Sequence, residues 1–196
     1  MIEKNFIGHT LSAKGERVTR GSNPGTSEVL PGDFINATDE EITDTVSKSA
    51  LAFQTYRTKT GREKAKFLRA IAEEIENLGE VLIERCCAES GLPLLRVKGE
   101  CGRTTFQLRM FADLIEEGSW VEAVIENGDS KRSPIPKPDL RRMLVPLGPV
   151  AVFAASNFPL AFSTAGGDTA SALAGGNTVI VKAHSCLLYT SDAADD

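Results

Sequence analysis

The chain has 196 residues, of which 41% are hydrophobic and 25% charged, and its formal net charge is −5. These values are typical of a globular protein, and an acidic balance without a stripe of Lys or Arg argues against nucleic-acid binding. No run of about 18 apolar residues is present, so no membrane span is predicted, and the first residues do not resemble a secretory signal. The four cysteines lack metal-ligand spacing, so we expect no bound metal, a reduced compartment and a cytoplasmic location.

Consecutive helices are predicted between residues 38 and 118. Capping boxes from Thr38 to Glu41 and from Thr60 to Glu63 mark two helix starts. A third helix is expected from about Gly79 to Ser90, and a fourth begins near Pro93. Each helix should bury one apolar stripe, and the packed helices should form one layer. The stripes expected in the first and last helices are Ile42, Val46, Ala50 and Phe53, and Val97, Cys101, Thr105, Leu108, Ala112 and Ile115.

A β-arm is predicted to follow the helices. Residues 120–126 and 140–146 favour strands, and they are separated by the turn Asn127-Gly128-Asp129 and a Pro-rich stretch. Such an arm is either a surface hairpin or an oligomerisation arm.

The last part of the sequence predicts a β-α-β unit. Residues 150–155 form a continuous apolar run, which is typical of a parallel strand buried on both faces. Pro159 is expected to start a helix rich in small residues, and residues 178–181 form a second strand. The fold class is therefore α/β with a parallel sheet.

Two polar residues stand at the carboxyl ends of these predicted strands. Asn157 follows the first strand and Lys182 ends the second. Taken alone, Asn157 is a turn residue and Lys182 a solvated cation. Because ligands bind beyond the carboxyl ends of parallel strands, the pair marks a candidate site. Residues 148–159 contain no GxGxxG, which argues against an ordinary dinucleotide phosphate loop.

These residues carry a family resemblance. Residues 148–160, with the core Asn157-Phe158-Pro159-Leu160, resemble the aldehyde dehydrogenase family, and residues 175–182 are similar to that family's next strand. The resemblance runs from about residue 23 to 185. It implies a partial aldehyde dehydrogenase fold with a helical layer, the first part of a Rossmann-like parallel sheet and a projecting β-arm.

Domain boundaries follow from this resemblance. Residues 1–119 would be the amino-terminal helical part of the cofactor-binding domain, 120–147 the β-arm with its oligomerisation strands, and 148–185 the first β-α-β of the sheet. Residues 137–143, 154–163 and 181–185 are most similar to the α-ketoglutaric semialdehyde (2,5-dioxovalerate) dehydrogenase branch. A small-molecule aldehyde substrate and a homo-oligomeric parent enzyme are the partners implied.

The resemblance also implies roles for individual residues. Asn157 would be catalytic, because its side-chain N–H would stabilise the oxyanion formed when a Cys thiolate attacks the aldehyde. The cofactor, NAD or NADP, would be bound by Lys182 at the ribose or 2′-phosphate and by Ser185. Ser185 stands where NAD-preferring relatives often place Glu, so we expect NADP to be accepted. The same resemblance gives a cofactor-binding position to Phe153, Ala154, Ala155 and Ser156.

The family's nucleophilic Cys and general-base Glu come later in the chain than Lys182. We therefore expect an amino-terminal fragment that is inactive alone, with Cys86, Cys87 and Cys101 serving as inert packing residues. Residues 186–196, which begin at Cys186, resemble the translation of a transposon-end adapter used in library preparation. We interpret them as a non-native tail.

Two alternative functions remain open at this point. One is an acyl-phosphate or acyl-CoA reductase of the same fold, which the absence of a Glu at the base position would favour. The other is a non-catalytic nucleotide-binding or oligomerisation module, which tight NADP binding to the chain alone would favour. The Asn157-Phe158-Pro159 block favours the dehydrogenase.

Overall fold

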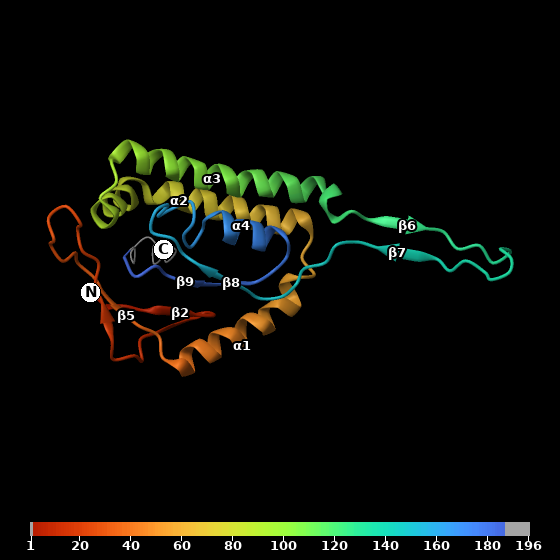
Figure 1. The fold of residues 1–196 in the computed structure, drawn as a ribbon, viewed down its shortest axis with the longest axis horizontal. Coiled ribbons are helices and arrows are strands. Elements are labelled where there is room, and N and C mark those ends of the chain that lie inside the picture. Colours follow the sequence, from red (N-terminus) through yellow and green to blue (C-terminus); the bar gives the residue numbers. More distant parts are fainter. Residues whose placement is uncertain (1, 187–196) are drawn as a thin grey trace.

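A computed structural model describes residues 2–186 of the chain. Helices α2 (Gly61–Ser90) and α3 (Leu94–Glu117) lie side by side along one edge, and α1 (Asp39–Tyr56) lies on the opposite side (Figure 1). A two-stranded arm, β6 (Val124–Glu126) and β7 (Leu140–Arg142), projects from the body. Residues 186–196 were interpreted from the sequence as a non-native tail. Of these, Cys186 is exposed in the structure, and residues 187–196 lie outside the described residues.

Both predicted capping boxes are confirmed. At the start of α1 the Thr38 hydroxyl accepts from the Glu41 backbone N–H, and the Glu41 carboxylate accepts from the Thr38 N–H. The same reciprocal pair begins α2 at Thr60. The separate helix expected from about Gly79 is present: Gly79 has the non-helical angles φ 56 and ψ −135, so α2 consists of two helical segments that meet at a kink there, and the second segment ends at Ser90. A glycine tolerates this positive φ without strain.

The core is formed where α2 and α3 face each other, with α4 (Gly167–Ala174) packed against both. The predicted apolar stripe of α3 is confirmed, apart from a half-buried Cys101. The residues that α3 contributes to this core are Leu108, Ala112 and Ile115, and its Val97 packs in a second cluster with Leu82, Ile83, Cys86 and Leu160. Within residues 2–186, no helix combines the length and apolarity needed to cross a bilayer.

The predicted buried face of α1 is wrong except for Phe53. Ile42 and Val46 are 53% and 50% exposed, whereas Glu41 is 2% exposed. The helix turns a polar face to the body because that face makes tertiary hydrogen bonds: Ser49 Oγ donates to Thr178 Oγ1 at 3.0 Å. Apolar periodicity alone therefore selected the wrong side of this helix.

Glu41 ties the start of α1 to the amino-terminal strands. Its carboxylate accepts from the Ser12 hydroxyl, from the Thr38 N–H at 2.8 Å and from the Lys14 N–H at 3.2 Å. These hydrogen bonds, that of Ser12 foremost, lower the pKa of Glu41 from its ordinary value of 4.5 to about 2. The ionised carboxylate is therefore the form that the folded chain stabilises.

This depressed pKa predicts a pH-dependent stability. A carboxyl whose folded pKa lies below its unfolded value stabilises the fold above about pH 4.5, and this contribution is lost as the pH falls toward 2. We expect Glu41→Gln to unfold at lower urea concentration than the parent chain at pH 7, and this difference to shrink between pH 4.5 and 2. A difference that is constant over that pH range would contradict the assignment.

The strands outside the β-α-β unit form small sheets. β5 (Asp33–Ile35) lies between β1 (Ile2–Glu3), which is parallel to it, and β4 (Val18–Thr19), which is antiparallel. β2 (Asn5–Ile7) pairs antiparallel with β3 (Thr10–Ser12).

In the arm, β6 pairs antiparallel with β7, with Ile125 opposite Arg141. Trp120, predicted to start the first arm strand, instead lies in the short 3₁₀ turn η1 (Ser119–Val121), half-buried against the core of α2 and α3.

The β-α-β unit is confirmed, with β8 (Val150–Phe153) parallel to β9 (Val179–Lys182) and α4 between them in sequence. Two details differ from expectation. β8 is not buried on both faces: Ala151 is exposed and Phe153 is 74% exposed. Within the described residues β8 has a single strand neighbour, β9, and one covering helix, α4, so its other face stays open.

The second difference is the start of α4, which begins at Gly167 and not at Pro159. Residues 154–166 form turns instead. In these turns the backbone N–H groups of Leu160 and Ala161 donate to the Glu100 side chain and not to carbonyl groups of a helix.

Candidate active site

The two parallel strands end at the same edge of the sheet. Phe153 and Lys182 are partners in the register of β8 and β9, and the Ala154 N–H donates to the Lys182 carbonyl at 3.2 Å. The predicted cofactor residues 153–156 therefore follow this edge, with Ala154 and Ala155 half-buried and Ser156 exposed. Ser185 lies beyond the end of β9 and is also exposed.

The charges at this edge suit an anionic ligand. Lys182 is exposed and forms no ion pair with a carboxylate in the part of the chain that the structure describes. None of residues 153–156 or Ser185 is acidic. An ammonium group beside exposed strand ends therefore fits a ribose hydroxyl or a phosphate of a dinucleotide.

Asn157 is exposed on the turn that leaves β8. The turn is folded back on itself, because the Ala155 N–H donates to the Phe162 carbonyl at 2.8 Å and the Phe162 N–H donates to the Phe158 carbonyl at 3.1 Å. Its far end is closed by the hydrogen bond from the Gly167 N–H to the Ala161 carbonyl, at 2.9 Å. The side-chain amide of Asn157 is therefore carried by a backbone of fixed shape.

Glu100 of α3, which was not among the residues predicted from the sequence, anchors this turn. It is 4% exposed, and its Oε1 accepts from the N–H groups of Leu160 and Ala161, both at 2.9 Å. A signal was present in the sequence: Glu100 shares a helical face with the buried Val97 and Thr104. A carboxylate within an apolar stripe must find hydrogen-bond donors, because an unpaired buried charge is costly.

Gly166 allows the turn to close. A Cβ at this position would lie 2.4 Å from the Ala161 carbonyl oxygen, which is backbone and cannot move aside easily. Gly166 is one of the small residues expected in the helix after Pro159. In the structure it instead allows two backbone segments to approach closely.

An aromatic and arginine cluster covers the same turn. Phe158 and Phe162 meet edge to face, with ring centroids 5.5 Å apart. The guanidinium of Arg96 lies 4.6 Å from the Phe158 centroid, and that of Arg103 lies 5.6 Å from it. Two cations of α3 are thus held beside the residue that follows Asn157.

The three helical cysteines do not have the character of nucleophiles. Burial raises the pKa of Cys86 to about 12, and burial also raises the pKa values of Cys87 and Cys101. A thiol reacts as its thiolate, so these side chains stay protonated and inert near neutral pH. No group of three or more His, Cys, Asp or Glu side chains arranged for a metal occurs within residues 2–186.

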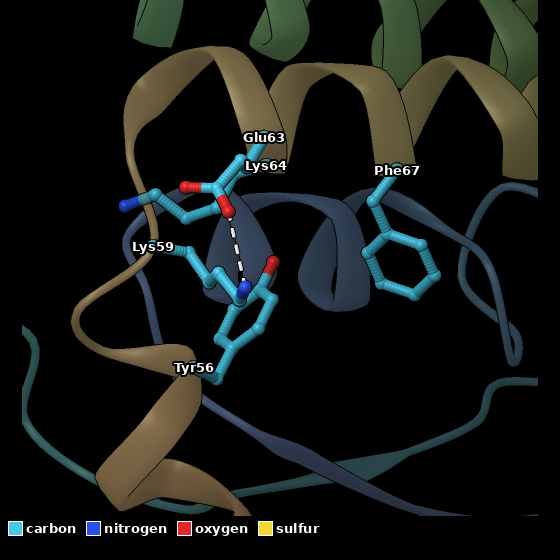
Figure 2. Close-up of a pocket in the computed structure, with 5 residues that line it drawn as sticks. All are labelled: Tyr56, Lys59, Glu63, Lys64 and Phe67. Atoms are coloured by element: carbon cyan, nitrogen blue, oxygen red, sulfur yellow. Dashed lines mark hydrogen bonds and ion pairs between the residues drawn. The ribbon is translucent and has the colours of Figure 1, made fainter.

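A cavity of about 370 Å³ lies away from this edge, at the junction of α1 and α2 (Figure 2). The Lys59 ammonium binds the Glu63 carboxylate across it at 3.0 Å. The Tyr56 hydroxyl donates to the Leu173 carbonyl, and burial raises the pKa of Tyr56 to about 12. None of the predicted site residues lines this cavity.

A second hollow, of about 580 Å³, lies beside β8 and includes Phe153. It lies between this strand and α4, and its other lining residues are Val150, Ala151, Val152, Asp168, Ser171, Ala172 and Asn177. Of the predicted site residues, Phe153 alone lines it.

Comparisons with known proteins agree with this arrangement. The chain is 56% identical over 188 residues to alpha-ketoglutaric semialdehyde dehydrogenase 2 of Azospirillum brasilense, covering 95% of this chain and 36% of that protein. It is 48% identical over 159 residues to alpha-ketoglutaric semialdehyde dehydrogenase of Acinetobacter baylyi, covering 81% of this chain and 30% of that protein. The chain therefore spans about a third of the length of these relatives, whose names are those of the predicted branch.

A solved structure supports the fold. The 1-pyrroline-5-carboxylate dehydrogenase from Thermus with bound NAD superposes with a TM-score of 0.83 at 20% identity, covering 97% of this chain and 35% of that one. The model of the aldehyde dehydrogenase family matches residues 11–190, a range that continues past Cys186, so the start of a non-native tail stays a prediction. With this match over most of its length and the Asn157-Phe158-Pro159 turn at the end of β8, the chain belongs to the aldehyde dehydrogenase family.

Proposed function

We propose that the chain is the amino-terminal part of an NAD(P)-dependent enzyme that oxidises α-ketoglutaric semialdehyde to the carboxylic acid. The observation that carries this proposal is the identity of 56% and 48% to two relatives named for that substrate. Enzymes of the family use NAD(P). We also propose that the parent enzyme acts in the cytoplasm.

Asn157 is proposed to act on the aldehyde oxygen. When a nucleophile attacks the carbonyl carbon, negative charge develops on this oxygen, and a fixed N–H donor stabilises that charge. The exposed Asn157 amide, on a turn held by Glu100, is a suitable donor. Because Cys86, Cys87 and Cys101 are protonated, we assign the nucleophile to none of them.

The cofactor is proposed to lie along the carboxyl ends of β8 and β9. When bound, its nicotinamide accepts a hydride from the substrate. Lys182 would bind the adenosine ribose or a 2′-phosphate, with residues 153–156 beside it. Ser185 places a neutral side chain three positions after Lys182, and a neutral side chain does not repel a 2′-phosphate. Acceptance of NADP follows from this residue.

An assay of the intact enzyme tests the proposal. Purified intact enzyme is expected to reduce both NAD and NADP when α-ketoglutaric semialdehyde is added. The 196-residue chain alone, assayed as the control, is expected to give no turnover, since its helical thiols are protonated. Turnover by the chain alone would contradict the assignment of the nucleophile, and much tighter binding of NAD than of NADP would contradict the role of Ser185.

The arm at residues 120–147 is proposed as an assembly surface. Ile125 of β6 and Leu140 of β7 are 63% and 51% exposed. These two strands project from the body (Figure 1). Exposed apolar side chains on an unaccompanied hairpin are typical of a surface that pairs with another chain. Light scattering on the intact enzyme tests for the homo-oligomer.

A further inference from the structure

Arg103 differs from the other basic residues of α3. Lys98 and Arg109 bind carboxylates of α2, at 2.7 and 2.6 Å. Arg96 lies 3.5 Å from the Glu100 carboxylate. Arg103 is exposed, and within residues 2–186 no ion pair joins it to a carboxylate. Its positive charge is therefore not balanced by a neighbour in this part of the chain.

Aromatic contacts nevertheless hold the Arg103 guanidinium in place. It lies 5.6 Å from the ring centroid of Phe158 and 5.5 Å from that of Phe162. Contact with ring faces leaves the N–H edge of a guanidinium free to donate hydrogen bonds. Phe158 directly follows Asn157, so the Arg103 guanidinium lies against the turn that carries the proposed oxyanion donor.

The proposed substrate has the complementary chemistry. α-Ketoglutaric semialdehyde carries its aldehyde at one end of a five-carbon chain and a carboxylate at the other, roughly 5 Å away. A guanidinium binds a carboxylate through two parallel hydrogen bonds, which gives both strength and orientation. An aldehyde without a carboxylate has no group for this interaction.

We propose that Arg103, oriented by Phe158 and Phe162, binds the substrate carboxylate and thereby selects acidic semialdehydes over uncharged aldehydes. This inference rests on the proposed function and extends it to substrate selection. Because Asn157 acts at the aldehyde end and Arg103 at the carboxylate end, loss of Arg103 weakens substrate binding more than it slows the chemical step.

The experiment compares two substrates on the intact enzyme. Arg103→Met, which keeps side-chain length and removes charge, is expected to raise the KM for α-ketoglutaric semialdehyde by about 10–100-fold while kcat changes by less than about 3-fold. The KM for pentanal, an uncharged five-carbon aldehyde, is expected to stay unchanged. Arg103→Lys is expected to recover part of the lost affinity, because it restores the charge without the planar fork.

Arg109→Met serves as the matched control, because this arginine of the same helix already binds Glu76. It is expected to leave the ratio of the two KM values unchanged. Equal effects of Arg103→Met on the semialdehyde and on pentanal would overturn the inference.

Binding of 2-oxoglutarate, the acid product, separates this inference from the proposed function. Calorimetry is expected to show binding to the parent enzyme that weakens by about 10-fold or more in Arg103→Met. If the parent enzyme binds 2-oxoglutarate in this Arg103-dependent way but oxidises no aldehyde, the proposed function fails and the anion site stands. If Arg103→Met binds 2-oxoglutarate as well as the parent does, the anion site is overturned whatever the activity.

Discussion

Replacing Asn157 by Ala in the intact enzyme is expected to lower kcat by about 10²–10³-fold, as the loss of one oxyanion donor does in other enzymes. The side chain is exposed at the end of β8 and its backbone is held by hydrogen bonds of the turn, so truncation removes a donor without disturbing packing. The KM for the aldehyde is expected to change much less, because charge develops on the oxygen only as the transition state forms.

Steady-state kinetics of Asn157→Ala and of a control, Asn77→Ala, measure this effect. Asn77 is exposed on α2 and belongs to none of the proposed sites, so the same chemical change there is expected to leave kcat unaltered. A kcat for Asn157→Ala within threefold of the parent value would remove Asn157 from the proposed chemistry.

Truncating Glu100 is expected to lower the free energy of unfolding by about 2–4 kcal/mol. The change to Ala leaves the N–H groups of Leu160 and Ala161 buried without an acceptor, and each such group costs about 1–3 kcal/mol. Glu100→Gln keeps one side-chain oxygen as acceptor, so it is expected to lose about half as much or less. Urea unfolding of the purified chain measures both differences.

Glu80→Ala is the matched control for Glu100→Ala. Glu80 is exposed and pairs with Lys98, also exposed, at 2.7 Å, and exposed ion pairs contribute about 0–1 kcal/mol. If Glu100→Ala proved no more destabilising than Glu80→Ala, Glu100 would not be the anchor of the Asn157 turn.

Features set by local chemistry were predictable from the sequence. The boxes at Thr38 and Thr60 each join a hydroxyl and a carboxylate three residues apart, so a short stretch of sequence suffices to specify them. The apolar run of β8 and the position of Asn157 after it were predicted for the same reason. The roles of Asn157 and Lys182 came from family resemblance, because a turn amide and a strand-end cation have no unique chemistry by themselves.

Features set by distant contacts were not predictable. The buried face of α1 follows from the bonds of Glu41 and Ser49 to remote segments, against the apolar pattern of the helix. The late start of α4 follows from Glu100, which takes two backbone N–H groups 60 and 61 positions further along the chain. In both cases a tertiary hydrogen bond outweighs a local preference.

The contact of Glu100 with Leu160 and Ala161 also has a consequence for synthesis. The partners are separated by 60 and 61 positions, and ribosomes add about 5–20 residues per second, so the two segments emerge roughly 3–12 s apart. Helix α3 leaves the ribosome first, so Glu100 lacks its backbone N–H donors until the turn arrives, and its charged neighbour in that interval is Arg96 of the same helix, 3.5 Å away. Slower translation of residues 100–161 would lengthen that interval.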